Sequence, residues 1–199
     1  MKKISVFCGS SMGNNSEYRD TAYLLGKRMA KKGIELVYGG TKIGLMGAVA
    51  DGVLYENGKV TGILPDFFKK REIAHPQINQ LILVNTMHER KVKMHELSDA
   101  VIALPGGFGT MEEFFEMLTW GQLGLHDKPV GLLNIKGFYD KLDKFIENMV
   151  NEGFLNKENK KMLIIENSID NLLDKFETYQ HPDVEKIIRE KINKAKQQQ

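Results

Sequence analysis

The sequence contains little of several features that mark particular classes of protein. Cys8 is the only cysteine, so no internal disulfide can form, and a cytoplasmic location is the expectation. No apolar run approaches the roughly 20 residues of a membrane-spanning helix. The first apolar run is short and is broken by Cys8 and Gly9, which is typical of a strand and not of a signal peptide. The net charge of +2 gives no indication of a nucleic-acid surface. We therefore expect neither a membrane nor a nucleic acid as partner.

Metal ligands are also sparse. Cys8 has no partner cysteine, and the histidines are scattered at positions 75, 88, 95, 126 and 181. His88 and His95 can share one helix face, but the intervening residues separate them by about 10 Å along the axis, too far for one ion. The sequence therefore predicts no metal site.

Apolar, β-branched stretches alternate with helical patterns along most of the chain. The 199 residues suit one medium domain, with 42% hydrophobic and 27% charged residues. The predicted strands span residues 4–8, 35–38, 60–64, 81–84, 100–104, 130–134 and 162–165. The predicted helices span residues 16–32, 45–57, 88–97, 110–123, 137–152 and 169–179. Continuous apolar strands separated by helices indicate a doubly wound α/β fold with a mostly parallel sheet in a single domain.

The C-terminal segment differs from the rest of the chain. We expect residues 1–180 to form the domain and residues 181–199 to form an amphipathic helix that ends in a polar tail. Its apolar positions at helical spacing are Val184, Ile187, Ile188 and Ile192. Because acidic and basic residues are interleaved there, docking on this subunit or a neighbour is favoured over membrane binding.

Glycine- and hydroxyl-rich turns follow the first, second and fifth predicted strands. They are CGSS (residues 8–11), GGTKIGLMG (39–47) and PGGFGT (105–110). Ligands of doubly wound sheets bind beyond the carboxyl ends of the strands, where these turns lie together. The last turn also opens a helix, whose N–H groups and dipole favour a phosphate. Neither G-x-x-x-x-G-K-[ST] nor G-x-G-x-x-G is present, so an ATP-hydrolysing loop and a nicotinamide cofactor are poorly supported.

The same residues also fit purely structural roles. Glycines after strands often only make tight turns. Thr110 and Glu113 fit a capping box, in which Glu113 would bond back to the start of its own helix. Arg90 and Lys91 would ordinarily be exposed helix charges, and Glu112 with Glu116 a solvated face. The coincidence of these features at one sheet edge favours a functional site.

Two motifs carry a specific resemblance. P-G-G-x-G-T-x-x-E at residues 105–113, together with M-H-E-R-K at 87–91, resembles the LOG ("Lonely Guy") family of cytokinin riboside 5′-monophosphate phosphoribohydrolases. The similarity covers about residues 3–180. It implies a Rossmann-like domain that forms homodimers, acts on an AMP-like nucleotide and needs no cofactor or metal.

The resemblance also implies roles for individual residues. Arg90 and Glu113 match the family's catalytic pair. Glu72 matches an acidic substrate-binding residue, although Lys70 and Ile73 replace the proline and leucine that flank it in the family. The remaining candidates for substrate binding are Lys91, Gly106, Gly107, Phe108, Gly109, Thr110, Glu112 and Thr119, with Ser10, Gly40 and Gly44 from the earlier turns.

The reaction implied is hydrolysis of the N-glycosidic bond of a purine nucleoside 5′-monophosphate, giving free base and ribose 5-phosphate. AMP and N6-isopentenyl-AMP both fit, and the sequence does not decide between them. Three alternatives stay open: a non-catalytic nucleotide or molybdenum-cofactor carrier of the same fold, a lysine decarboxylase, and a partner-binding role of the C-terminal helix. The decarboxylase is disfavoured because the resemblance supplies no lysine for pyridoxal phosphate.

Overall fold

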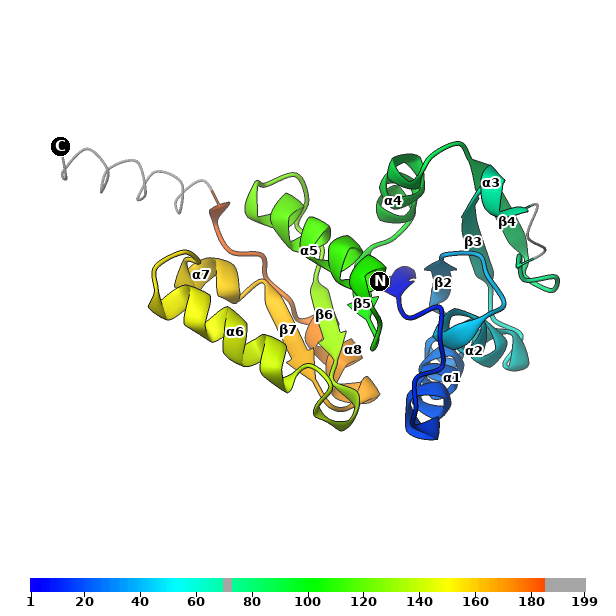
Figure 1. Ribbon diagram of the computed structural model, residues 1–199, viewed down its shortest axis with the longest axis horizontal. Coiled ribbons are helices and arrows are strands. Elements are labelled where there is room, and N and C mark those ends of the chain that lie inside the picture. Colours follow the sequence, from blue (N-terminus) through cyan, green and yellow to red (C-terminus); the bar gives the residue numbers. More distant parts are fainter. Residues whose placement is uncertain (70–72, 185–199) are drawn as a thin grey trace.

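The chain forms one parallel sheet covered by helices on both faces, in a computed structural model that describes residues 1–69 and 73–184 (Figure 1). The strands are β1 (Lys3–Phe7), β2 (Glu35–Tyr38), β3 (Val60–Pro65), β4 (Gln80–Val84), β5 (Ala100–Ala103), β6 (Val130–Leu133) and β7 (Leu163–Glu166). They lie in the order β4-β3-β2-β1-β5-β6-β7, and every neighbouring pair is parallel. The predicted doubly wound α/β fold is confirmed.

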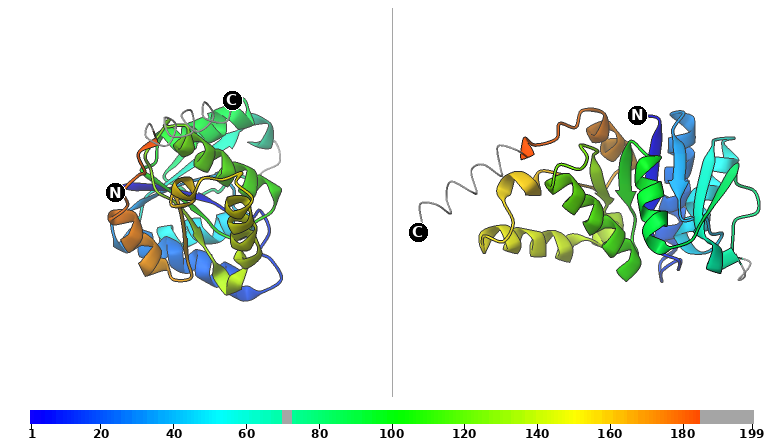
Figure 2. Two further views of the ribbon diagram at one scale, coloured as in Figure 1. Left: turned by 90° about the vertical axis from the view of Figure 1, so that its left-hand side faces the viewer. Right: turned by 90° about the horizontal axis from the view of Figure 1, so that it is seen from above.

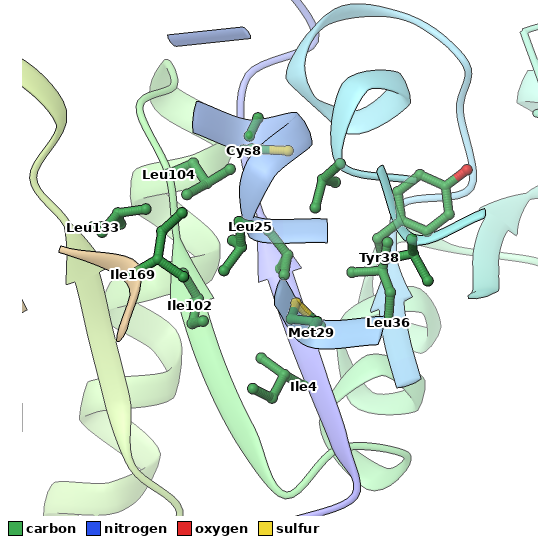
Figure 3. Close-up of a cluster of buried hydrophobic side chains, with 14 of the residues drawn as sticks. Ile4, Cys8, Leu25, Met29, Leu36, Tyr38, Ile102, Leu104, Leu133 and Ile169 are labelled. Atoms are coloured by element: carbon green, nitrogen blue, oxygen red, sulfur yellow. The ribbon is translucent and has the colours of Figure 1, made fainter. Parts of the chain in front are cut away.

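The helices of the described residues pack in two layers (Figures 1 and 2). They are α1 (Ser16–Lys31), α2 (Gly44–Tyr55), α3 (Asp66–Lys69), α4 (Met87–Glu96), α5 (Phe108–Gln122), α6 (Asp140–Asn151), α7 (Lys157–Lys160) and α8 (Ile169–Glu177), with a 3-10 turn η1 at Ile135–Gly137. Because side chains alternate along a strand, Ile4 and Val6 of β1 pack with α1, α2 and α8, whereas Phe7 packs with α4 and α5. Figure 3 shows Ile4 in the first of these two clusters.

The order of the strands reverses between β1 and β5. After β4, at one edge of the sheet, the chain returns through α4 to place β5 beside β1. The turns beyond these strands are bonded to one another, since the Gly9 N–H donates to the Pro105 carbonyl over 3.0 Å. The Leu45 N–H, in the first turn of α2, donates to the Gly9 carbonyl over 3.0 Å. Three glycine-rich turns therefore meet at the topological switch point, where ligands of such sheets bind.

Two predicted helix starts are wrong. Helix α5 begins at Phe108 with Gly107 as its N-cap, so Thr110 lies inside its first turn and the capping-box interpretation is incorrect. The helix predicted from residue 137 begins only at Asp140, because Lys136 and Gly137 both adopt positive φ angles, 55° and 70°. A residue in this left-handed region cannot continue a right-handed helix.

The chain beyond α8 runs along the C-terminal end of α5. A Cβ atom on Gly124 would lie 3.6 Å from Val184, and one on Gly121 would lie 3.5 Å from the His181 ring. Residues 185–199, which include Ile187, Ile188 and Ile192 of the predicted C-terminal helix, lie outside the described residues. Within residues 1–69 and 73–184, no helix has the length and apolar character that a membrane span needs.

Candidate active site

A cavity of about 570 Å³ opens at the carboxyl ends of the central strands, and its volume is in the range of small-molecule sites. The turns after β1, β2, β3 and β5 contribute to its wall, together with α4 and α5. Its polar side chains include Ser10, Thr41, Arg90, Thr110 and Glu113. The site predicted at the sheet edge therefore coincides with a cavity.

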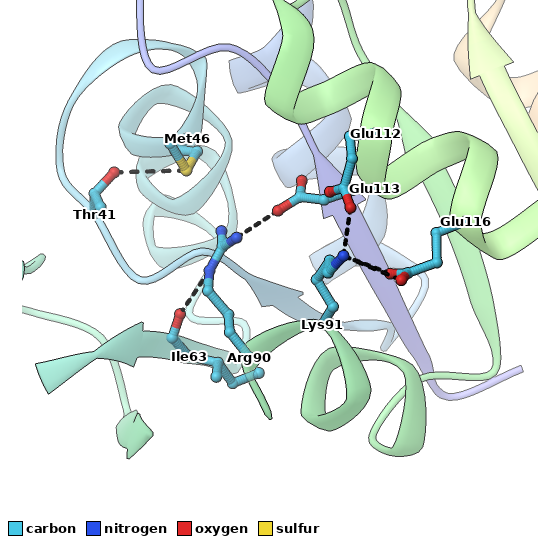
Figure 4. A network of polar contacts seen from close by, with 8 residues as sticks. All are labelled: Thr41, Met46, Ile63, Arg90, Lys91, Glu112, Glu113 and Glu116. Atoms are coloured by element: carbon cyan, nitrogen blue, oxygen red, sulfur yellow. Dashed lines mark hydrogen bonds and ion pairs between the residues drawn. The ribbon is translucent and has the colours of Figure 1, made fainter. Parts of the chain in front are cut away.

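Arg90 and Glu113 form an ion pair in this cavity (Figure 4). Arg90 lies on α4 and Glu113 on α5, and the Arg90 Nη1 group donates to Glu113 Oε1. Arg90 Nε also donates to the Ile63 carbonyl at 3.2 Å, which fixes the plane of the guanidinium. Both residues are buried, with exposed fractions of 8% and 7%. Two charged residues are almost never this buried unless they are paired, and both face the cavity.

Gly39 makes room for the arginine. A Cβ atom at this position would lie 2.2 Å from Arg90 Nη2 and 2.8 Å from the Met46 sulfur. The glycine after β2 is therefore required by the approach of the guanidinium, and not only by the turn.

Burial raises the pKa of the Glu113 carboxyl, and the positive charge of Arg90 offsets this only in part. Cys8 also lines the cavity, and burial together with the charge of Glu113 raises its pKa far above the ordinary range. Because the thiolate is the reactive form of cysteine, Cys8 is not suited to act as a nucleophile.

The N-terminus of α5 faces the cavity without a side-chain cap. Its N-cap Gly107 has no capping hydrogen bond, whereas Asn15, Thr86 and Ser168 cap α1, α4 and α8. Cβ atoms added to Gly107 or Gly109 would meet nothing within 4 Å. Open space, uncapped N–H groups and the dipole of a 15-residue helix are features that favour an anion at this position.

The rest of this turn has two further features. Gly106 lies against Thr110, since an added Cβ atom would be 2.1 Å from the Thr110 oxygen. Phe108 is 98% exposed at the edge of the cavity, so its ring lacks packing partners among the described residues.

Gly40, Gly44 and Gly106 of the candidate set do not line this cavity. Gly40 and Gly44 shape the second turn. Gly44 has a φ angle of 62°, and its Cβ position lies 2.2 Å from the Ser10 carbonyl carbon. Gly40 has a φ angle of 79° and packs against Leu64 and Leu81. Both conformations favour glycine, so these residues hold the second turn against its neighbours.

A second ion-pair cluster lies beside the catalytic candidates but outside the cavity. The Lys91 ammonium contacts Glu112 and lies 3.0 Å from Glu116 (Figure 4). Burial lowers the pKa of Lys91, but its hydrogen bonds to both carboxylates raise it more, and the net pKa is raised. Thr119 donates to the Phe115 carbonyl at 2.7 Å within α5. Glu72 lies outside the described residues.

Sequence reasoning missed the apolar side chains of the cavity. They come from the turn after β2, from α2, β3 and α3, from the segment before β4 and from the start of α4: Ile43, Met46, Leu64, Phe68, Ile73 and Met87. Ile43, Met46 and Met87 lie within the motifs at residues 39–47 and 87–91, but those motifs assign them no role. Their convergence with Leu64, Phe68 and Ile73 follows only from the fold. In the described part of the chain, no cluster of three or more histidine, cysteine or acidic side chains is arranged to hold a metal ion.

Comparison with known proteins identifies the family. A family model described as "Possible lysine decarboxylase" matches residues 46–176. The chain is 46% identical over 178 residues to the cytokinin riboside 5′-monophosphate phosphoribohydrolase LOG1 of Arabidopsis thaliana, covering 89% of this chain and 84% of that one. The chain belongs to the family of the cytokinin riboside 5′-monophosphate phosphoribohydrolases. Its similarity to the probable phosphoribohydrolase LOGL3 of Oryza sativa subsp. japonica is equally close, with 46% identity over 179 residues and the same coverage.

The fold of the family extends to more distant proteins. The molybdenum cofactor binding protein of Rippkaea orientalis superposes with a TM-score of 0.68 at 24% identity, covering 89% of this chain and 96% of that one. A likeness at this identity shows a shared fold.

Proposed function

We propose that this protein hydrolyses the N-glycosidic bond of purine nucleoside 5′-monophosphates, AMP or N6-isopentenyl-AMP, and releases the free base and ribose 5-phosphate. The observation that carries the proposal is the buried Arg90–Glu113 pair in a cavity that also contains the uncapped N-terminus of α5. The relatives' activity, given in their names, is the reaction that such a site suits.

The α5 N-terminus binds the 5′-phosphate. Gly106, Gly107, Phe108, Gly109 and Thr110 supply the turn, and the open space at Gly107 and Gly109 lets the phosphate approach the backbone closely. Binding energy from this remote group then holds C1′ of the ribose against the catalytic pair. Ser10, from the turn after β1, lines the same cavity and offers a hydroxyl to the ribose or the phosphate.

Glu113 stabilises the reacting sugar. Breaking the bond between C1′ and N9 places positive, oxocarbenium-like charge on the ribose, which a carboxylate at C1′ stabilises. The same carboxylate accepts a proton from the attacking water, whose oxygen bonds to C1′, and the released base takes up a proton. The buried position of Glu113 strengthens this interaction because little water screens it.

Arg90 keeps Glu113 ionised and in place. Its guanidinium contacts both Glu113 and the Ile63 carbonyl, so its planar fork positions the carboxylate. Without Arg90, burial alone would favour the protonated, inactive form of Glu113.

The cavity also bears on the alternatives. A carrier needs a binding cavity but has no use for a buried carboxylate–guanidinium pair, so the pair favours catalysis. The described lining residues include no lysine that could bind pyridoxal phosphate, and Lys91 is held outside the cavity by Glu112 and Glu116.

A homodimer accounts for the candidates that lie outside the cavity. The resemblance makes Glu112 and Thr119 substrate contacts, yet both are exposed on α5. In a dimer they contact a substrate bound to the second copy, and Lys91 positions Glu112. The exposed apolar side chains of α4 and of the segment after α5 are consistent with such an interface: Met87, Val92, Leu123 and Leu125. In this proposal residues 1–180 are the catalytic domain, residues 181–199 stabilise the assembly, Glu72 binds substrate and the protein is cytoplasmic.

Product identification tests the function. Purified protein is incubated with AMP in phosphate-free buffer, and the products are separated and identified by mass spectrometry. Adenine and ribose 5-phosphate in equal amounts are expected. A requirement for added phosphate would indicate a phosphorylase, and AMP binding without any released adenine would indicate the carrier.

A further inference from the structure

One wall of the cavity is held by a short antiparallel backbone pairing that lies outside the motifs at residues 87–91 and 105–113. Residues 73–75 run beside residues 40–42, with Thr41 and Ala74 paired as an isolated bridge. The Lys42 N–H donates to the Ile73 carbonyl at 2.9 Å, and the His75 N–H donates to the Gly40 carbonyl at 3.0 Å. Two backbone hydrogen bonds alone are a weak attachment for a loop segment.

The side chain of His75 anchors this contact. Its ring is buried, and Nε2 lies 3.1 Å from Asp51 Oδ1 on α2. The Gln77 N–H donates to Nδ1 at 3.2 Å, so Nδ1 is the acceptor and the ring proton is on Nε2, which donates to Asp51. The ring therefore connects the loop to a helix on one side and orders the following turn on the other.

The pairing of residues 73–75 with residues 40–42 shapes the wall of the cavity and does not involve the catalytic pair. Thr41 and Ile73, which the two backbone bonds hold together, both line the cavity. Ile73 belongs to the apolar part of the wall, whereas Arg90 and Glu113 are supplied by α4 and α5. A purine base, flat and largely apolar on its faces, suits that apolar part.

We propose that His75, held by Asp51, is a positioning residue for substrate binding: it fixes the 73–75 segment against the 40–42 turn and so sets the wall that receives the base. This inference rests on the proposed function for the identity of the ligand. It assigns His75 no contact with the reacting atoms.

Two substitutions, each of which keeps only one of the two hydrogen bonds of the His75 ring, distinguish the contributions of these bonds. His75→Gln places an amide nitrogen near the Nε2 position and keeps a donor to Asp51. His75→Asn keeps an acceptor near Nδ1 for the Gln77 N–H but loses Asp51. We expect His75→Asn to raise KM for AMP about tenfold with kcat changed less than about threefold, and His75→Gln to restore KM to near the wild-type value. Asp51→Ala should match His75→Asn, Asp51→Asn should retain a low KM, and the double variant should be no worse than either single one.

His126 is a matched control. Its Nε2 atom lies 2.9 Å from the Met117 carbonyl and its Nδ1 accepts the Lys128 N–H at 3.1 Å. Both ring nitrogens are thus bonded as in His75, with a backbone carbonyl in place of the carboxylate, at a place that does not line the cavity. His126→Asn should lower thermal stability by a similar amount and leave KM unchanged. If His75→Asn and His126→Asn changed stability alike and neither changed KM, His75 would be structural only.

Amide hydrogen exchange tests the contact independently of activity. In His75→Asn the backbone amides of residues 42 and 75 should exchange at least about tenfold faster than in the wild type. Unchanged exchange, or a fall in kcat with an unchanged KM, would overturn the inference. If the wild type released no base, the proposed function would fail separately. The KM comparison would then be replaced by calorimetric titration with AMP, and equal affinities of wild type and His75→Asn would overturn the positioning role.

Discussion

Arg90 and Glu113 lie on different helices, and the guanidinium of Arg90 donates to the Glu113 carboxylate inside the cavity. Helix α4 precedes β5 and helix α5 follows it, so the two side chains meet across the strand that lies beside β1 at the switch point. Each motif supplies one member of the pair. The catalytic account therefore depends on how the sheet places α4 and α5 relative to one another as much as on either motif.

Replacing the carboxylate should abolish turnover without loss of the fold. We expect Glu113→Gln to lower kcat at least about a hundredfold and to retain AMP binding, because the amide keeps the shape but cannot stabilise a cationic sugar or accept a proton. Steady-state assays with calorimetric titration measure both quantities. Glu116→Gln, one turn later on α5 and not lining the cavity, is the control and should retain most of the activity. Near-wild-type turnover of Glu113→Gln would remove Glu113 from the mechanism.

The carboxyl of Glu113 should titrate above the ordinary glutamate value of about 4.3. Burial raises its pKa more than Arg90 lowers it, so the ionised form is lost at a higher pH than on an exposed glutamate. NMR titration of glutamate labelled with ¹³C at the carboxyl checks this, with Glu113→Gln identifying the signal. Since the ionised form is the active one, kcat/KM for AMP, which reports the free enzyme, should fall as the pH decreases through the same pKa. A signal that titrates at or below the ordinary value would contradict the electrostatic account.

Gly39→Ala should impair catalysis while leaving the fold intact. The added Cβ atom would lie 2.2 Å from Arg90 Nη2, and the flexible arginine side chain can move away, but only by leaving its place beside Glu113. We expect a fall in kcat of at least about tenfold in a protein that still folds, although the loss of the buried ion pair lowers its melting temperature. Gly121→Ala, whose Cβ would lie no closer than 3.3 Å to its nearest neighbour, the His126 ring, is the control. If Gly39→Ala were fully active, the position of Arg90 would be less critical than proposed.

His95 should make the protein less stable as the pH decreases from 7 towards 4. Burial, followed by the charges of Lys128 and His126, lowers the pKa of His95 to about 4. The unfolded chain binds a proton near pH 6.5 that the folded protein does not accept until about pH 4, so the free energy of unfolding falls across this interval. With the full shift in pKa, the free energy of unfolding would be lower by about 2 kcal/mol at pH 5 than at neutral pH. Because the ring is partly exposed, we expect a loss of about 1 kcal/mol.

Urea unfolding at pH 7.5 and pH 5.0 measures the effect of His95. The wild type should lose more stability between these conditions than His95→Gln, which removes the titrating ring. Equal losses would show that His95 does not contribute to the pH dependence.

Much of the fold could be predicted because its elements have strong local signals. The strand expected at residues 35–38 matches β2 as found, since a short, mostly apolar run between a helix and a glycine turn has few alternatives. Helix α7 was not predicted, because four polar residues show no periodicity. The break before α6 was missed for a different reason. Lys136 is not a residue type that indicates a positive φ angle.

The site was predictable only in part. Its place at the sheet edge follows from three glycine-rich turns and a general rule for parallel sheets, but the roles of Arg90 and Glu113 came from the resemblance. The apolar wall around Ile73 and the steric role of Gly39 depend on contacts between segments far apart in sequence. The assignment of individual substrate contacts stays a prediction.

The central claim is that the α5 N-terminus binds a 5′-phosphate so that the Arg90–Glu113 pair can cleave the glycosidic bond. Its most direct test uses the wild-type protein with AMP, N6-isopentenyl-AMP and the matching nucleosides. Chromatography of the reaction mixtures measures the rate at which each compound releases free base. We predict release from the monophosphates with kcat/KM at least about a hundredfold above that of the nucleosides. Equal rates with and without the phosphate would contradict the account.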